Sequence, residues 1–150
     1  MAIIEDSIEI NAPQDMVYRI SQDYGVRFDW DPFPDRLEMI GGGDYTPERG
    51  KRVYVRSKLG MSMVVEFVQV SPPSRAAIAM VSGPRILKKF AGTWIFEAIS
   101  PERTHVRFRY AIEAAPAVLR PIIDALAAAY FRRTVRKRLL GLKRYCERSP

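Results

Sequence analysis

The segment that most constrains the fold of this 150-residue chain is its last one, residues 116–150. It is the only long stretch with helical periodicity, and most of the chain before it has the pattern of strands. Such a helix would run for about 30 residues, or ~45 Å. Its apolar side chains recur in steps of three to five along one drifting stripe: Leu119, Ile123, Leu126, Tyr130 or Phe131, Val135, Leu139, Leu142 and Cys146. A terminal helix that follows a run of strands must bury this stripe on their sheet.

The same segment carries the whole net charge of the chain. Its nine Lys and Arg residues face two acids, which gives the chain's formal charge of +7. Most of these cations lie opposite the apolar stripe: Arg132, Arg133, Arg136, Lys137, Lys143 and Arg144. This basic face has three interpretations: a solvated surface, a surface for anionic lipid headgroups, or an RNA-binding surface. No exposed aromatic residues alternate with the charges, so RNA is disfavoured and no DNA partner is expected.

Composition excludes several classes of protein. The length fits one domain, residues 1–150, and the 47% hydrophobic content suffices for a core. A lone cysteine, Cys146, excludes an internal disulfide and favours a reducing compartment. With one histidine as well, no common zinc site can form, and we expect no metal or cofactor. The first residues lack a signal-peptide pattern and no stretch can span a bilayer, so we expect a cytoplasmic protein.

Before the last helix, the residue pattern predicts a strand over residues 2–11 and a short helix over residues 13–22. Asn11 is a candidate helix cap, and Pro13 suits a first helical turn. Residues 23–34 indicate a second short helix or a loop. Further strands follow, joined by short turns: Arg36–Ile40, Lys51–Ser57, Met61–Val70, Ala76–Val81, Phe90–Ile99 and Thr104–Ala114. The pattern predicts an α+β fold with one antiparallel sheet of about seven strands.

Bulky side chains occupy the predicted inner face of this sheet, whereas residues 124–129 of the last helix are mostly alanine. Large residues opposite small ones either interdigitate or leave a gap that an apolar ligand fills. Periodicity alone leaves both alternatives open. We therefore expect residues 119–131 to line a cavity, if one exists, and residues 132–148 to form a solvated outer face.

Five stretches in order resemble the SRPBCC superfamily, also known as the START/Bet v 1-like or helix-grip fold, and within it the bacterial polyketide cyclase/dehydrase-like group. They are SIEINAPQDMVYRIS (7–21), FDWDPF (28–33), FAGTWIFEAIS (90–100), RTHVRFRYAIE (103–113) and VRKRLLGLKRYCE (135–147). The resemblance covers nearly the whole chain. It implies a curved sheet wrapped around the long helix, with an apolar cavity between them. It implies no fixed catalytic set, because one fold hosts many functions.

We therefore expect the protein to bind a hydrophobic small molecule such as a lipid, polyketide or aromatic compound. The expected ligand-binding residues are Trp30, Met63, Phe67, Met80, Trp94, Phe96, Phe108, Tyr110, Leu126 and Tyr130. The alternative is a cyclase/dehydratase-type enzyme that uses the same cavity, with Tyr110, Tyr130 or Arg56 acting on a carbonyl. A third interpretation is a protein that docks on a membrane or RNA through its basic helix.

Other candidate residues have simpler interpretations. His105 falls on the outer face with Arg107 and Arg109, which favours a surface histidine. Asp29 and Asp31 form a DxD pair, but their place beside Pro32 favours turn or capping carboxylates over metal ligands. The glycines at 41–43 precede no helix, which favours a turn over a phosphate-binding loop.

The direction of Arg56 depends on the hairpin that follows it. The register of this strand, which carries Tyr54 and Arg56, follows from the length of the connection. A two-residue connection would place Arg56 opposite Met63 and point it into the cavity. A three-residue connection would place Val55 opposite Met63 and point Arg56 to solvent. The outward arginine is the favoured alternative.

Overall fold

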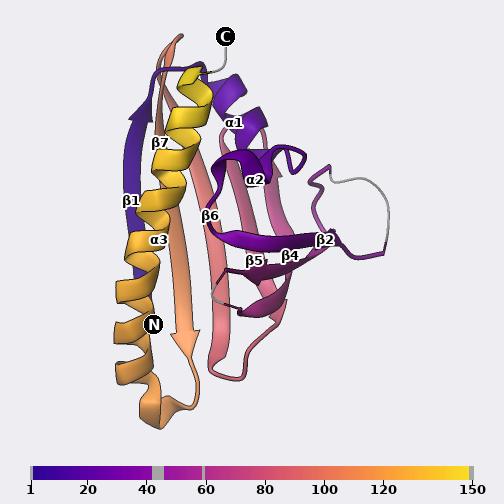
Figure 1. The fold of residues 1–150 in the computed structure, drawn as a ribbon, viewed down its shortest axis with the longest axis vertical. Coiled ribbons are helices and arrows are strands. Elements are labelled where there is room, and N and C mark those ends of the chain that lie inside the picture. The colour runs from indigo at the N-terminus through magenta and orange to yellow at the C-terminus, as the bar shows by residue number, and fades with distance from the viewer. Residues whose placement is uncertain (1, 42–45, 59, 149–150) are drawn as a thin grey trace.

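One antiparallel sheet dominates the computed structural model, which describes residues 2–41, 46–58 and 60–148 (Figure 1). Within these residues the sheet has seven strands in the order β1-β7-β6-β5-β4-β3-β2. The strands are β1 (Ala2–Ile10), β2 (Pro34–Met39), β3 (Arg52–Ser57), β4 (Ser62–Ser71), β5 (Arg75–Ser82), β6 (Leu87–Ser100) and β7 (Arg103–Ala114). The sheet therefore agrees with the predicted α+β, helix-grip class.

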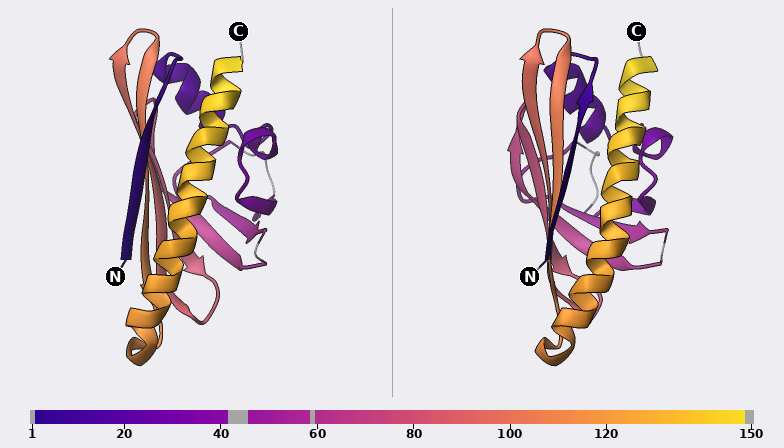
Figure 2. Two further views of the ribbon diagram at one scale, coloured as in Figure 1. Left: turned by 60° about the vertical axis from the view of Figure 1, so that its left-hand side comes forward. Right: turned by 90° about the vertical axis from the view of Figure 1, so that its left-hand side faces the viewer.

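The helices all lie on the inner face of the curved sheet (Figure 2). They are α1 (Gln14–Gln22), the single turn α2 (Arg27–Trp30), the 3-10 turn η1 (Ala117–Leu119) and α3 (Arg120–Arg148). Helix α3 runs along β1 and β7, with Pro121 in its first turn. Asn11 does not cap α1, whose N-cap is Pro13; instead the Asn11 N–H donates to Glu147 near the end of α3.

Strand β7 shows why the sheet has one solvent-exposed face and one buried face. Its buried side chains alternate with partly or fully exposed ones, so Val106, Phe108 and Tyr110 point inward. On the outer face Arg107 pairs with Glu97 across to β6, and Arg109 pairs with Glu5 of β1. His105 lies on this outer face, as its strand parity predicts.

The β3–β4 hairpin settles the direction of Arg56. Val55 lies opposite Met63 and Arg56 opposite Ser62, which is the register of the three-residue connection. Arg56 points outward and donates to Asp35 at 2.9 Å, so it is not available to a ligand in the cavity. Tyr54 likewise bonds outside the cavity, to the Ser62 hydroxyl at 2.8 Å. Of the three glycines predicted to form a turn, Gly41 has φ +86°, and residues 42 and 43 lie outside the described part of the chain.

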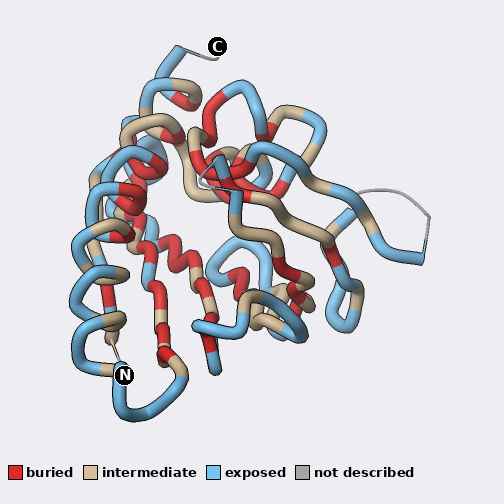
Figure 3. The backbone as a smooth tube through the Cα atoms, turned by 60° about the horizontal axis from the view of Figure 1, so that its bottom comes forward, coloured by how far each residue is buried: buried red, intermediate tan, exposed pale blue. Residues whose placement is uncertain are grey.

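Helix α3 is not buried evenly along its length (Figure 3). Residues 120–130, its N-terminal half, contain no buried side chain, whereas residues 131–148, its C-terminal half, carry all of those that are buried. Helix α3 lies very close to the end of α2 at Gly141. A Cβ atom there would overlap the carbonyl oxygen of Trp30, so only glycine lets α2 lie directly against α3.

Candidate functional site

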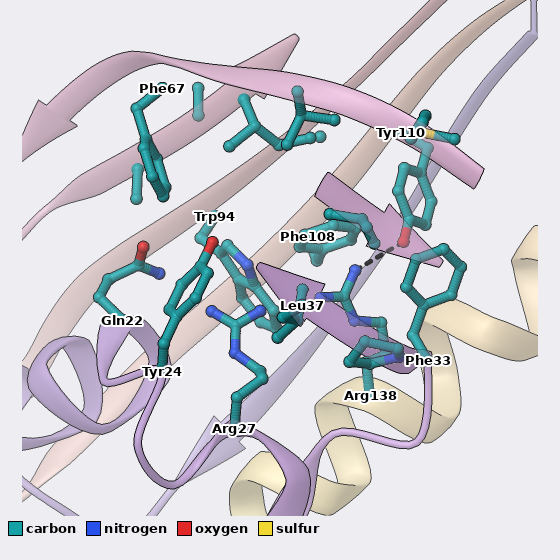
Figure 4. Close-up of a pocket in the computed structure, with 18 of the residues that line it drawn as sticks. Gln22, Tyr24, Arg27, Phe33, Leu37, Phe67, Trp94, Phe108, Tyr110 and Arg138 are labelled. Carbon is teal, nitrogen blue, oxygen red and sulfur yellow. Dashed lines mark hydrogen bonds between the residues drawn. The ribbon is translucent and has the colours of Figure 1, made fainter. Parts of the chain in front are cut away.

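A cavity of about 60 Å³ lies between the inner face of the sheet, the α1–α2 segment and the C-terminal half of α3 (Figure 4). Its apolar wall comes from alternate residues of β3 to β7, because only every second side chain of a strand faces inward. That wall includes Val55, Met63, Val65, Phe67, Ala76, Ile78, Phe90, Trp94, Phe108 and Tyr110. Gln22, Tyr24, Arg27, Phe33, Leu37 and Arg138 close the opposite side.

An ion-pair cluster forms the polar side of this cavity. The Arg138 Nη2 donates to Asp31 Oδ2 at 2.8 Å, and its Nε donates to Asp31 Oδ1 at 3.0 Å. The Arg27 Nη1 donates to the same Oδ2 at 3.3 Å, and Arg27 Nη2 donates to the Ser21 carbonyl. The Phe33 N–H donates to Asp31 Oδ1 at 3.0 Å. This buried carboxylate thus holds α2, the following turn and α3 together.

The cluster also contacts the sheet, through Tyr110 of β7. Arg138 Nη1 donates to the Tyr110 hydroxyl at 2.6 Å, shown by the dashed line in Figure 4. Because a guanidinium has no acceptor, this bond does not use the hydroxyl hydrogen of Tyr110. Tyr110 can therefore still donate that hydrogen to an oxygen of a bound molecule.

Burial and the nearby charges decide the protonation states. Burial raises the pKa of Tyr110 to about 12, and the opposing effect of the Arg138 guanidinium is smaller. Burial, the largest single effect, would lower the pKa of Arg138, but the Asp31 carboxylate and the Tyr110 hydroxyl together outweigh it, so the pKa is raised. Burial also raises the pKa of Tyr24, against the Arg27 guanidinium. At neutral pH the site therefore presents neutral phenols at Tyr24 and Tyr110 and a charged guanidinium at Arg138.

Aromatic rings surround both guanidinium groups. The Cζ atom of Arg138 lies 4.8 Å from the ring centroid of Phe108 and 5.0 Å from that of Phe33. The Cζ atom of Arg27 lies 4.6 Å from the Tyr24 ring and 5.1 Å from the Trp30 ring. Ring faces carry partial negative charge, so these contacts stabilise cations that are largely removed from water.

Half of the predicted ligand-binding residues line the cavity. Met63, Phe67, Trp94, Phe108 and Tyr110 all lie in its wall. The structure brings them together because they come from neighbouring strands and share the inward parity. Their contact with a ligand stays a prediction.

The other five predicted residues lie outside the cavity wall. Trp30 is buried, but it packs edge-on against Trp94, with ring centroids 5.9 Å apart. Phe96 is buried beside Trp94 and Tyr18, further along the sheet. Met80 is only partly buried, close to Gly83.

The prediction for the helix was wrong about which half lines the cavity. Leu126 is 68% exposed, and Tyr130 packs its ring against Phe131 without reaching the cavity. Of the alanines in residues 124–129, Ala127 and Ala128 are partly buried against the core, but none of them lines the cavity. The cavity-lining residue of α3 is instead Arg138, in the half that was expected to be a solvated outer face.

The sequence did contain a signal for Arg138. Phe131, Val135 and Leu142 are buried on the stripe, and Arg138 lies three residues after Val135 and four before Leu142. A charged residue at that spacing lies on the apolar face of a helix, which requires a buried partner. Asp31 of the DxD pair is that partner, and Asp29 is exposed. No group of three or more possible metal-ligating side chains occurs among the described residues.

An open groove of about 750 Å³ adjoins the cavity on the outside of α1 and the β4–β5 turn. Gln22 and Tyr24 line both the groove and the cavity, so these two side chains separate them. A molecule larger than the cavity would have to pass between these side chains or displace them.

Comparison with known proteins assigns this architecture to a class. The model of the family described as "Polyketide cyclase / dehydrase and lipid transport" matches residues 1–147. The chain therefore belongs to this family, in agreement with the resemblance seen in its sequence. No curated protein matches the chain.

Solved structures show the same fold at low sequence identity. The Zhui aromatase/cyclase from Streptomyces sp. R1128 has a TM-score of 0.79 at 16% identity, covering 98% of this chain and 94% of the other. A START superfamily protein from Mycobacterium smegmatis has a TM-score of 0.77 at 12% identity, covering 97% of each chain. Norcoclaurine synthase from Thalictrum flavum, in complex with dopamine and hydroxybenzaldehyde, has a TM-score of 0.73 at 12% identity, covering 99% of this chain and 88% of the other. At these identities the likeness concerns the fold.

Proposed function

We propose that the protein binds a hydrophobic small molecule in the cavity between the sheet and the C-terminal half of α3. The observation that carries this proposal is the cavity wall itself, which is aromatic and aliphatic except for one localised polar cluster. Ligand sites typically combine a mainly apolar lining with a few polar groups that fix orientation. Family membership supports the same conclusion, since its description covers both polyketide chemistry and lipid transport.

The size of the cavity limits what enters without a rearrangement. Pockets for drug-sized ligands span roughly 300–1,000 Å³, whereas this cavity is about 60 Å³. A lipid or polyketide would therefore extend past Gln22 and Tyr24 into the adjoining groove of about 750 Å³. Removing the Tyr24 ring should ease this passage.

A direct test uses the protein as purified under mild conditions. Native mass spectrometry should detect a co-purified apolar molecule, or titration with fatty acids and polyaromatic compounds should change the emission of Trp94. Tyr24→Ala should speed ligand association several-fold in stopped-flow fluorescence, and Phe28→Ala, which removes an exposed ring, serves as the control. Absence of any bound or binding apolar compound would overturn the proposal.

An enzyme of the cyclase/dehydratase type is the alternative for the same cavity. Of its three candidate residues only Tyr110 lies in the cavity wall. Its raised pKa keeps it protonated, so it would serve as a hydrogen-bond donor or general acid to a carbonyl oxygen. Tyr110→Phe should then abolish turnover of a polyketide substrate but preserve its binding. Unchanged turnover would exclude this role for Tyr110.

Contact with an anionic membrane is a second candidate, because the start of α3 exposes aliphatic side chains. Val118 is 82% exposed, Ile122 63% and Leu126 68%. Exposed apolar residues beside basic ones are typical of helices that bind at a membrane interface. No helix of the described residues is long and apolar enough to cross a membrane.

Two variants separate the contributions to membrane binding. Replacing Val118, Ile122 and Leu126 with serine should abolish co-sedimentation with phosphatidylserine vesicles. Charge reversal at Arg132, Arg133, Arg136 and Lys137 should weaken it in a salt-dependent way. Vesicle binding that survives both variants would exclude α3 as the docking element, and a place in the cytoplasm stays a prediction.

A further inference from the structure

The buried charges of the described residues do not balance. Three of the buried side chains carry a formal charge: Arg27, Asp31 and Arg138. Two cations and one anion leave an excess of +1 inside the protein, where an uncompensated charge is unfavourable. Surface ion pairs elsewhere cannot supply the missing anion, because they lie in water.

The excess positive charge faces the cavity. Both arginines belong to the cavity wall, whereas Asp31 lies behind them, and no acidic residue lines the cavity. Arg138 directs its donors to Asp31 and Tyr110. Arg27 has a free donor, because its buried Nε atom has no hydrogen-bond partner.

The neighbouring rings do not remove this imbalance. The rings of Tyr24 and Trp30 stabilise the Arg27 guanidinium through their electron-rich faces, but they carry no net charge. Arg27 therefore contributes a net positive charge to the cavity wall. The opposite wall, with Met63, Val65 and Phe67, offers only apolar contacts.

We propose that the cavity takes an apolar organic carboxylate, with its carboxylate against Arg27 and its aromatic or aliphatic body against the strands of the sheet. This inference rests on the proposed binding function and specifies its ligand class. One carboxylate would bring the formal charge of these buried groups to zero. The Tyr110 hydroxyl can still donate its hydrogen, so it would favour a ligand with an acceptor oxygen over a ligand with a positive charge.

Matched pairs of probes test the charge. Benzoate and benzamide have nearly the same shape and differ in charge, as do 2-naphthoate and 2-naphthamide. Isothermal titration calorimetry at pH 7 should show each acid binding about tenfold more tightly than its amide, as expected when a charge-assisted bond replaces a neutral one. The acid should also raise the melting temperature more than the amide does at equal concentration.

Two variants locate the effect. Arg27→Gln should remove the preference for the acids, so that each acid and its amide bind with about equal affinity. Arg56→Gln removes the same charge from an outward-facing arginine and should preserve the preference. A purely structural role of Arg27 would instead weaken acid and amide equally. If Arg27→Gln does not fold, Arg27→Lys, which keeps the charge, should retain the preference for the acids.

The outcomes separate this inference from the proposal on which it depends. Amides that bind as tightly as acids to the unmodified protein would overturn the inference and leave hydrophobic ligand binding standing. A preference for acids that survives Arg27→Gln would also overturn it. Failure of all four probes, with no co-purified apolar molecule, would overturn both.

Discussion

The two halves of α3 share one continuous helix but contribute differently to the protein. In the N-terminal half, residues 120–130, Leu126 is 68% exposed; in the C-terminal half, residues 131–148, Phe131 is 2% exposed. The first half has the more apolar composition, and the second has most of the charge. The contrast teaches that composition does not decide which part of a helix is buried: the position of the sheet and of α2 does.

The strongest way to break this contrast is to remove the buried charge from the C-terminal half. Arg138→Met leaves Asp31 with one arginine and Tyr110 without its partner. We expect the free energy of unfolding to fall by about 3–5 kcal/mol in urea titrations, as for other broken buried ion pairs. Arg136→Met is the control, because Arg136 is exposed and pairs with Asp6; its loss should be under about 1 kcal/mol. Equal losses would contradict the buried ion pair of Arg138.

A comparison of two apolar residues tests the same point without charge. Phe131 contacts the rings of Phe90 and Tyr110, with centroids 5.5 Å and 4.9 Å away. Phe131→Ala should therefore lower the free energy of unfolding by about 3–5 kcal/mol, as for other buried aromatic side chains. Leu126→Ala should change it by less than about 0.5 kcal/mol, since Leu126 is exposed. A costly Leu126→Ala would mean that the N-terminal half is buried in solution.

The phenol that Arg138 contacts gives a pH test. The pKa of Tyr110 is raised to about 12 from an ordinary value near 10, so folding favours its protonated form. Its contribution to stability is complete below pH 10 and is lost as pH rises from 10 to 12, by up to about 3 kcal/mol. Because Tyr18 and Tyr24 also have raised pKa values, the readout is the difference from Tyr110→Phe. That difference should change across this pH range; a constant difference would contradict the assignment.

A smaller effect is expected from the glycine that lets α2 touch the C-terminal half. Alanine favours a helix over glycine by about 1 kcal/mol, yet Gly141→Ala should destabilise the protein by about 1–3 kcal/mol. The added Cβ would meet the Trp30 carbonyl and displace the turn that carries Asp31. Ala129→Gly, at an exposed site of the same helix, should cost about 1 kcal/mol through propensity alone. A stabilised Gly141→Ala would show that α2 lies further from α3.

Much of the fold could be predicted from local pattern. Alternation in residues 104–114 predicted the inward side chains of β7, including Phe108 and Tyr110, because the period of a strand fixes its faces. The stripe predicted the buried positions Val135, Leu139 and Leu142 for the same reason at helical period. Five of the ten predicted ligand-binding residues line the cavity, and all five are strand residues.

The predictions that were wrong depended on contacts between distant segments. Leu126 and Tyr130 have the spacing of core residues, but Leu126 is exposed and Tyr130 is only partly buried. Arg138 lies in the segment 132–148 that was expected to be solvated, and its partners are far away in sequence: Asp31 is 107 residues away and Tyr110 is 28. A local window contains neither partner, so it cannot show that the charge is compensated.

By itself, the sequence determined the order of the elements, the face that each strand turns inward and the stripe of the last helix, because backbone geometry translates residue spacing directly into faces. Only the tertiary structure decided which half of that helix closes the cavity. The single turn of α2 packs against Gly141, and this contact places Asp31 between Arg27 and Arg138. The excess positive charge at the cavity arises because α2, the turn after it and α3 come together in the folded protein. The spacing of residues along the chain does not predict this contact.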